Sequence, residues 1–261
     1  MLTALTALLA VFRMVVIPAQ FQDTHFSCTE TELENTVLRA QDYFNDQFGG
    51  QCEFSFDIAP SVTLPKDLSY YGAKDALLYE AVRDACLQSS EDIDFSIYDN
   101  DSDGEVDNVF ILVAGMSEAD GASSDCIWPQ HGMLKDSGAE LHLDGKTVNS
   151  FTVSCELASD EGSAPRPAGI GIFCHELSHA FGLKDLYDTD GTGSGGNAPG
   201  LWNTSLMDTG CKNAAGMCPP NLNAIDYELL GAGVCDTLEI GDYTLEPVNR
   251  NGHYLIFETG N

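Results

Sequence analysis

Apolar and polar residues follow two different periods along this chain. Short apolar or alternating runs predict strands over residues 13–20, 51–58, 108–115 and 147–155. Apolar positions at helical spacing predict helices over residues 73–88, 168–182 and 221–231. A further helix is expected to follow Ser27-x-x-Glu30, which has the form of a capping box, and to run to about Phe48. Residues 189–200 are glycine-rich and are expected to be irregular.

The order of these elements predicts a single α/β (α+β) domain, with strands early and long helices between them. The chain has 261 residues, shows no internal repeat and contains no low-complexity linker. Residues 1–11 form a short apolar stretch without basic residues, which we interpret as a leader or signal remnant. That stretch is too short to span a bilayer, and we expect no membrane span elsewhere.

The charge balance narrows the range of partners. There are 41 Asp and Glu against 11 Lys and Arg, a formal net charge of -30. Nucleic-acid binding is disfavoured, because phosphate contacts need clustered Lys and Arg. The balance suits a secreted protein and one that binds hard cations such as calcium. It does not determine the oligomeric state.

Nine cysteines are spread along the chain without a paired C-x-x-C motif. This pattern predicts disulfide bonds in an oxidising compartment rather than a cysteine zinc cluster. The odd number leaves at least one thiol without a partner in this chain, and Cys211 and Cys218 are spaced to close a small loop. For Cys174 we expect a structural disulfide, because it points about 100° away from its neighbour His175 around a helix.

The segment H-E-L-S-H-A-F-G-L-K-D, residues 175–185, carries the main chemical signal. His175 and His179 are four residues apart, so on a helix they share one face and can both bind one Zn²⁺. Glu176 then projects beside the metal, where it can act as the general base for a zinc-bound water. Gly182 permits a sharp turn that swings Asp185 back as third ligand.

Two neighbouring carboxylates, Asp188 and Asp190, compete with Asp185 for the third position. The fourth position is expected to stay open for water, as catalysis requires.

A second candidate metal site lies in D-N-D-S-D-G-E-V-D, residues 99–107. Its spacing is that of the first part of an EF-hand loop, with glycine at the sixth position. The expected structural Ca²⁺ ligands are the carboxylates of Asp99, Asp101, Asp103 and Asp107 and the backbone carbonyl of Glu105. Position twelve is Phe110, so the usual bidentate glutamate is absent, and an acidic β-turn is the alternative.

The zinc segment resembles the extended motif of the metzincin clan, in the variant with aspartate in place of the last histidine. S-L-M-D, residues 205–208, resembles the Met-turn, with Met207 at the matching position. Four further segments are similar to immune inhibitor A-type metalloproteases: residues 98–110, 126–131, 182–190 and 200–210. The resemblance is collinear over about residues 12–257. One departure is Gln130-His131, where the family more often has histidine directly after proline, so the resemblance gives His131 no role.

The resemblance implies a metzincin-like catalytic domain over residues 12–261, with a mixed twisted sheet, an active-site helix and a Met-turn under the metal. It also implies a secreted zinc endopeptidase, made with a propeptide and further domains. We therefore interpret this chain as truncated at its C-terminus.

The substrate is expected to be a protein or peptide that pairs with an edge strand, for which 147–155 is the candidate. Tyr187 is either an oxyanion stabiliser or a packing residue. Two alternatives stay open: an inactive calcium-stabilised extracellular binding domain, and a zinc hydrolase of a non-peptide amide.

Overall fold

The computed structural model describes residues 11–73, 77–159 and 164–257. The expected leader, except Val11, lies outside the described residues. The helices are α1 Glu30–Phe48, α2 Leu68–Gly72, α3 Leu78–Ser89, α4 Ile170–Ala180, α5 Ala224–Leu230 and α6 Val248–Asn251. The strands are β1 Val11–Gln20, β2 Glu53–Ile58, β3 Val62–Thr63, β4 Glu105–Val106, β5 Val109–Met116, β6 Gln130–Met133, β7 His142–Leu143, β8 Lys146–Val148, β9 Ser150–Ala158, β10 Arg166–Pro167, β11 Val234–Thr237 and β12 His253–Ile256.

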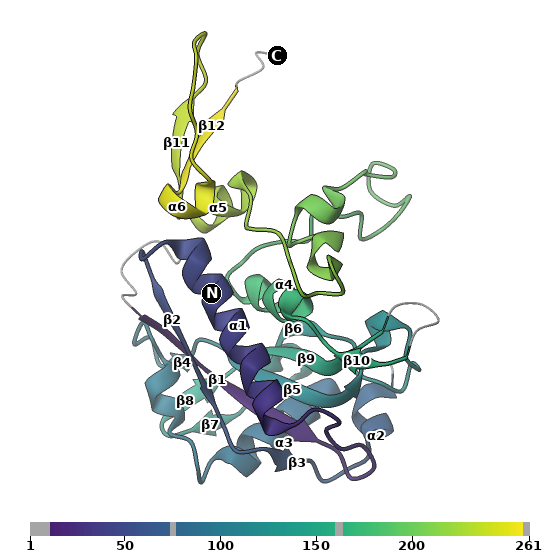
Figure 1. Ribbon diagram of the computed structural model, residues 1–261. Helices are drawn as coiled ribbons and strands as arrows, with labels where there is room; N and C mark the ends of the chain where they lie inside the picture. Colours follow the sequence, from purple (N-terminus) through teal and green to yellow (C-terminus); the bar gives the residue numbers. More distant parts are fainter. Residues whose placement is uncertain (1–10, 74–76, 160–163, 258–261) are drawn as a thin grey trace.

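The main sheet is mixed and has the order β10-β9-β5-β1-β2, with β3 paired to β1 and β6 paired to β9. Strands β9, β5, β1 and β2 run parallel, whereas β6 and β10 run antiparallel to β9. The expectation of a mixed α/β fold is therefore confirmed (Figure 1).

Each face of the sheet buries its own hydrophobic cluster, because successive side chains of a strand point to opposite faces. Phe12, Met14 and Val16 of β1 pack with α1 and α4, while Val15 and Ile17 pack with α3. Helices α1 and α4 thus share one face of the sheet and contact each other (Figure 1).

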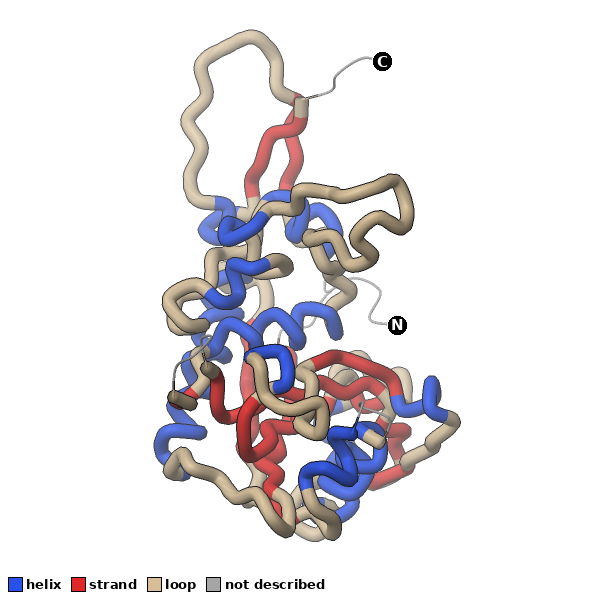
Figure 2. Tube along the Cα trace, turned by 90° about the vertical axis from the view of Figure 1, so that its right-hand side faces the viewer, coloured by secondary structure: helices blue, strands red, loops and turns tan. Residues whose placement is uncertain are grey.

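The C-terminal part of the described chain projects away from the main sheet. Strands β11 and β12 form a separate parallel pair, and the loop between them extends furthest from the strands of the main sheet (Figure 2). Among the described residues, no helix combines the length and apolar character that a bilayer crossing requires.

Several local expectations differ from the structure. The capping box at α1 is formed by Thr29 and Glu32, two residues later than expected, because Thr29 has the extended conformation of an N-cap. The predicted strand 147–155 is divided into β8 and β9, which belong to different sheets. The helix over 73–88 begins only at Leu78, and residues 74–76 lie outside the described part.

The prediction of disulfide bonds is wrong. All nine cysteines lie in the described part of the chain, and none of them is in a disulfide, including Cys174 and the pair Cys211 and Cys218. The buried cysteines are divided between the two hydrophobic clusters, for example Cys174 in one and Cys86 in the other. They pack there as small apolar side chains. The cysteine count therefore gives no structural argument for an oxidising compartment.

Candidate metal centre

Helix α4 presents two different faces. Ile170, Phe173, Cys174 and Leu177 recur at helical spacing and are buried in the cluster shared with α1. His175, Glu176 and His179 line a cavity of about 450 Å³ on the other side of the helix. The packing of the apolar stripe therefore fixes the orientation of the polar groups.

The chain reverses direction directly after α4. Gly182 has a φ of 96°, a conformation that glycine adopts without steric cost, and its N–H donates to the carbonyl of His179 at 3.0 Å. The N–H of Leu183 donates back to Ser178 at 3.2 Å. This turn brings Asp185 beside the two histidines, as the sequence predicts.

His175, His179 and Asp185 converge on one point. Oδ1 of Asp185 lies 3.3 Å from Nε2 of His175 and 3.3 Å from Nε2 of His179. Ligand atoms at 2.0–2.1 Å from a tetrahedral ion are separated by about 3.3 Å, so this spacing matches a zinc site. Oδ1 of Asp185 is also buried without a hydrogen-bond donor among the described residues. The three groups fit a divalent metal ion.

The outer nitrogen of each imidazole is held by a backbone carbonyl. Nδ1 of His175 lies 2.8 Å from the carbonyl oxygen of Leu206, and Nδ1 of His179 lies 2.9 Å from that of Leu183. With a proton on Nδ1, the Nε2 lone pairs point at the candidate metal position.

Glu176 lies beside these ligands rather than among them. It is only 9% exposed, and burial raises the pKa of its carboxyl to about 7, against the lowering effect of the two histidines. The backbone N–H of His131 on β6 donates to its carboxylate. Burial alone would raise the pKa of Asp185, but the two imidazoles beside its carboxylate hold that pKa well below the usual range.

The two competing carboxylates have other roles. Asp188 accepts hydrogen bonds from the N–H groups of Asp190, Gly191 and Ala198, and Asp190 accepts two from Ser194. Both therefore hold the glycine-rich loop, and neither belongs to the converging group.

Met207 is fully buried in the cluster that contains α4. Its carbonyl accepts from the N–H of Leu186 at 2.8 Å, one residue after Asp185. The neighbouring Leu206 is the residue whose carbonyl holds His175. Residues 205–208 therefore contact both ends of the candidate zinc segment.

The sequence left the role of two residues at the cavity open. Tyr187 is 43% exposed, lines the cavity and hydrogen-bonds to Asp185, and burial is the main cause that raises its pKa to about 12. His131 also lines the cavity. The pKa of its imidazole is lowered to about 4, mainly by burial and secondly by the nearby His179. The sequence signal for His131 was weak, because β6 has only four residues and directly follows Pro129.

The acidic loop is only partly assembled as predicted. Carboxylate oxygens of Asp99, Asp101 and Asp103 lie within 4.8 Å of one another, and Gly104 makes the expected turn with a φ of 96°. Asp107 does not join them, because Asn100 donates to its Oδ2 from both its backbone and its side chain. Burial raises the pKa of Asp107 to about 6. The carboxylate of Glu105 is also outside this group, and its expected role is through its carbonyl.

A lysine already neutralises part of this loop. Nζ of Lys146 on β8 lies 2.6 Å from Oδ2 of Asp99. Burial would raise the pKa of Asp99, but Lys146 and the N–H groups of Gly104 and Asp103 lower it. The loop therefore has an internal counter-charge that its sequence did not indicate.

Comparison with known proteins identifies the family. The family model of the immune inhibitor A peptidase M6 catalytic domain matches residues 17–229. The chain belongs to this family. It is 25% identical over 246 residues to immune inhibitor A of Bacillus thuringiensis subsp. alesti, covering 74% of this chain and 34% of that protein. It is 27% identical over 224 residues to the pre-pro-metalloprotease PrtV of Vibrio cholerae, covering 74% of this chain and 23% of that protein.

These relatives support a metalloprotease and confirm the family resemblance drawn from the sequence. The chain spans only about a third and a quarter of the length of these two relatives.

Proposed function

We propose that this chain is a zinc-dependent endopeptidase in which His175, His179 and Asp185 hold the metal. The observation that carries this proposal is the equal 3.3 Å spacing of both Nε2 atoms from one buried oxygen of Asp185. Two neutral imidazoles and one carboxylate form a donor set that zinc accepts while a fourth position stays open.

When bound, zinc would supply Lewis-acid polarisation of the peptide carbonyl and acidify a water molecule. Glu176 acts as general base, because its carboxylate lines the same cavity and the N–H of His131 orients it. It takes a proton from the attacking water and gives it to the leaving nitrogen. Met207 provides the apolar floor beneath the histidines, as in a metzincin Met-turn.

The substrate pairs with β6 rather than with the strand that the sequence favoured. β9 is paired with β5 on one edge and with β6 and β10 on the other, so its described backbone has no open edge near the metal. β6 pairs only with β9 among the described strands, and Gln130 and His131 line the metal cavity. An extended peptide can add to its outer edge.

The loop at 99–107 remains the candidate structural calcium site. Its support is the convergence of Asp99, Asp101 and Asp103. Because Lys146 already contacts Asp99, calcium binding requires this ammonium group to move away.

We assign residues 12–261 to the catalytic domain and place the protein outside the cell. The name pre-pro-metalloprotease of one relative supports a secreted product, since a pre-segment and a pro-segment precede such an enzyme.

The test combines metal content with casein hydrolysis, for the wild type and for Glu176→Gln. One zinc per chain in both proteins, with hydrolysis lost only in the variant, supports the proposal. The variant Glu140→Gln, which changes an exposed glutamate, should behave as wild type.

Each alternative gives a different result. Zinc without casein hydrolysis in any protein favours a hydrolase of a non-peptide amide. Absence of zinc from the wild type, with calcium bound, favours the inactive binding domain.

A further inference from the structure

Neither of the two tryptophans of this chain is buried. The side chain of Trp128 is 46% exposed and that of Trp202 is 66% exposed. Tryptophan has a large apolar ring system and is highly buried on average in folded proteins, so two exposed tryptophans need a physical explanation. Both lie on segments that border the candidate metal centre.

Trp128 lines the cavity of about 450 Å³ that contains the candidate metal ligands. It comes two residues before β6, on the strand side of this cavity. Tyr187, which is 43% exposed, lines the same cavity from the segment that follows Asp185. Two exposed aromatic rings from distant parts of the sequence therefore border one opening.

Trp202 belongs to a segment that rests against the residues directly after Asp185. A Cβ added to Gly200 would lie 3.0 Å from the carbonyl oxygen of Leu186 and 3.3 Å from Cα of Tyr187. Trp202 follows Gly200 by only two residues. Its exposed indole therefore starts from backbone that lies next to the metal cavity.

The backbone of Trp202 is strained. Its φ is 53°, in the left-handed region, where a bulky side chain is a rare outlier. Buried Asp208 holds this conformation, because its Oδ2 accepts from the N–H of Leu201 at 2.7 Å and from that of Trp202 at 2.6 Å. Glycine would adopt this conformation without steric cost, so the indole is present although the backbone disfavours it.

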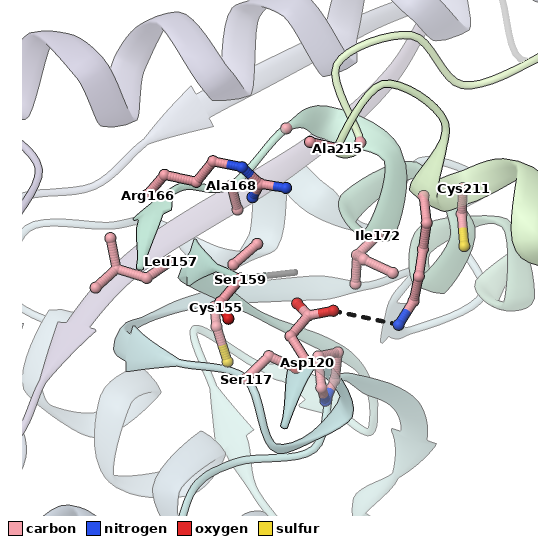
Figure 3. A pocket seen from close by; sticks show the side chains of 15 residues that line it. Ser117, Asp120, Cys155, Leu157, Ser159, Arg166, Ala168, Ile172, Cys211 and Ala215 are labelled. Carbon is pink, nitrogen blue, oxygen red and sulfur yellow. Dashed lines mark hydrogen bonds and ion pairs between the residues drawn. The ribbon is translucent and has the colours of Figure 1, made fainter. Parts of the chain in front are cut away.

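The segment that carries Trp202 is also fastened beyond it. Nδ2 of Asn213 donates to the carbonyl of Asn203 at 2.9 Å. Nζ of Lys212 lies 3.2 Å from Oδ1 of Asp120, the ion pair drawn as a dashed line in Figure 3. A ligand that packs on Trp202 therefore orders little additional backbone, which favours binding.

We propose that Trp128 and Trp202 form an aromatic contact surface for apolar side chains of an extended polypeptide substrate, outside the residues that flank the cleaved bond. The inference rests on the proposed peptidase function. Tryptophan offers a large rigid apolar area at low entropic cost and is enriched among residues that dominate binding. A polypeptide is the occupant, because one ring lines the cavity in which a peptide bond would be cleaved and the other adjoins it.

The kinetic test uses peptides of increasing length around one cleavable bond, with Leu or Ser at the outer positions on either side. For long peptides with Leu, Trp202→Ala should raise KM by about tenfold and leave kcat unchanged. Peptides too short to reach Trp202 should show no change. Tyr243→Ala, which removes an exposed aromatic ring in the loop after β11, should behave as wild type on all peptides.

A second variant separates binding from a structural role. Trp202→Gly removes the indole and suits a φ of 53°, so the urea midpoint of unfolding should rise while KM for the long Leu peptides rises as in Trp202→Ala. A lower midpoint together with an unchanged KM would show that Trp202 serves the fold, and this result overturns the contact surface.

A binding assay separates the surface from the catalytic proposal. In the double variant Glu176→Gln, Trp128→Phe, Trp202 is the only tryptophan, so its fluorescence reports directly on bound peptide. Long Leu peptides should change the emission and bind about tenfold more tightly than their Ser counterparts. Cleavage by wild type without any such response overturns the surface and leaves the peptidase intact. The response without cleavage by wild type overturns the peptidase alone, and a response to cellohexaose but to no peptide overturns a polypeptide as the occupant.

Discussion

Nδ1 of His175 lies 2.8 Å from the carbonyl oxygen of Leu206, 31 residues further along the chain. This contact joins α4 to the segment that contains Met207, and it determines which nitrogen of His175 faces the candidate metal position. His179 is held in the same way by Leu183. Both imidazoles are therefore oriented by backbone atoms, which no side-chain substitution removes directly. Asp185 is the remaining candidate ligand, and its role can be tested by substitution.

Replacing Asp185 should weaken zinc binding strongly. Asp185→Asn keeps the shape of the side chain but removes the negative charge that both Nε2 atoms face at 3.3 Å. We expect zinc affinity to fall by at least about 100-fold, measured by competition with a chromophoric chelator. Asp188→Asn is the matched control, because Asp188 holds only the glycine-rich loop. An equal loss in both variants would show that Asp185 is not the third ligand.

Removing Lys146 should uncover a calcium site. Lys146→Met takes away the ammonium group 2.6 Å from Asp99 and leaves three carboxylates close together. These repel one another unless a cation lies between them. The variant should therefore lose thermal stability without calcium and recover it with calcium.

Calcium affinity, measured by calorimetry, should rise by at least about tenfold in this variant, because calcium no longer competes with an ammonium group. Lys135→Met, which changes an exposed lysine, is the control. If calcium binds neither the wild type nor Lys146→Met, the loop is an acidic turn without a metal.

A methyl group at Gly171 should destabilise the fold. The added Cβ would lie 1.7 Å from the carbonyl oxygen of Cys211, and backbone must move to admit it. We expect the free energy of unfolding to fall by about 2–3 kcal/mol or more, as for other overpacked positions.

Urea unfolding measures this loss, with Gly241→Ala as the control because its added Cβ would meet Tyr243 only at 3.7 Å. Equal stability of the two variants would mean that segment 211–216 does not rest firmly on α4.

The sequence was most informative where one period continued over many residues. The continuous apolar run of β5 and the apolar stripe of α4 were enough to predict these two elements. The spacing of the histidines on α4 then indicated two candidate metal ligands. The sequence did not predict β6. This strand has only four residues and follows a proline, so it is too short to show an alternation of apolar and polar residues. Its place beside the metal comes from pairing with β9, a long-range contact.

The sequence also did not predict the ion pair between Lys146 and Asp99. Lys146 and Asp99 are 47 residues apart, so no local pattern indicated that the acidic loop carries its own counter-charge. The cysteines misled for a similar reason, because a count cannot show that the buried ones are divided between two hydrophobic clusters while Cys218 and Cys235 are exposed.

Asp226 should make stability depend on pH. Its side chain is fully buried at the start of α5, Oδ1 has no hydrogen-bond partner among the described residues, and burial raises the pKa to about 6. Below the unfolded-state value near 3.8, the carboxyl is protonated in both states and costs nothing. As the pH rises from about 4 to 6, the unfolded chain ionises first, so the free energy of unfolding falls.

Asp226→Asn removes this titration while keeping an oxygen that can accept from the N–H of Asn223. The variant should therefore gain stability relative to wild type between about pH 4 and pH 6, by at most about 3 kcal/mol, with no further change above pH 6. Urea unfolding at pH 4, 5, 6 and 7 measures the difference, and Asp46→Asn, an exposed position on α1, is the control. A difference that does not vary with pH would show that Asp226 titrates alike in the folded and unfolded chain.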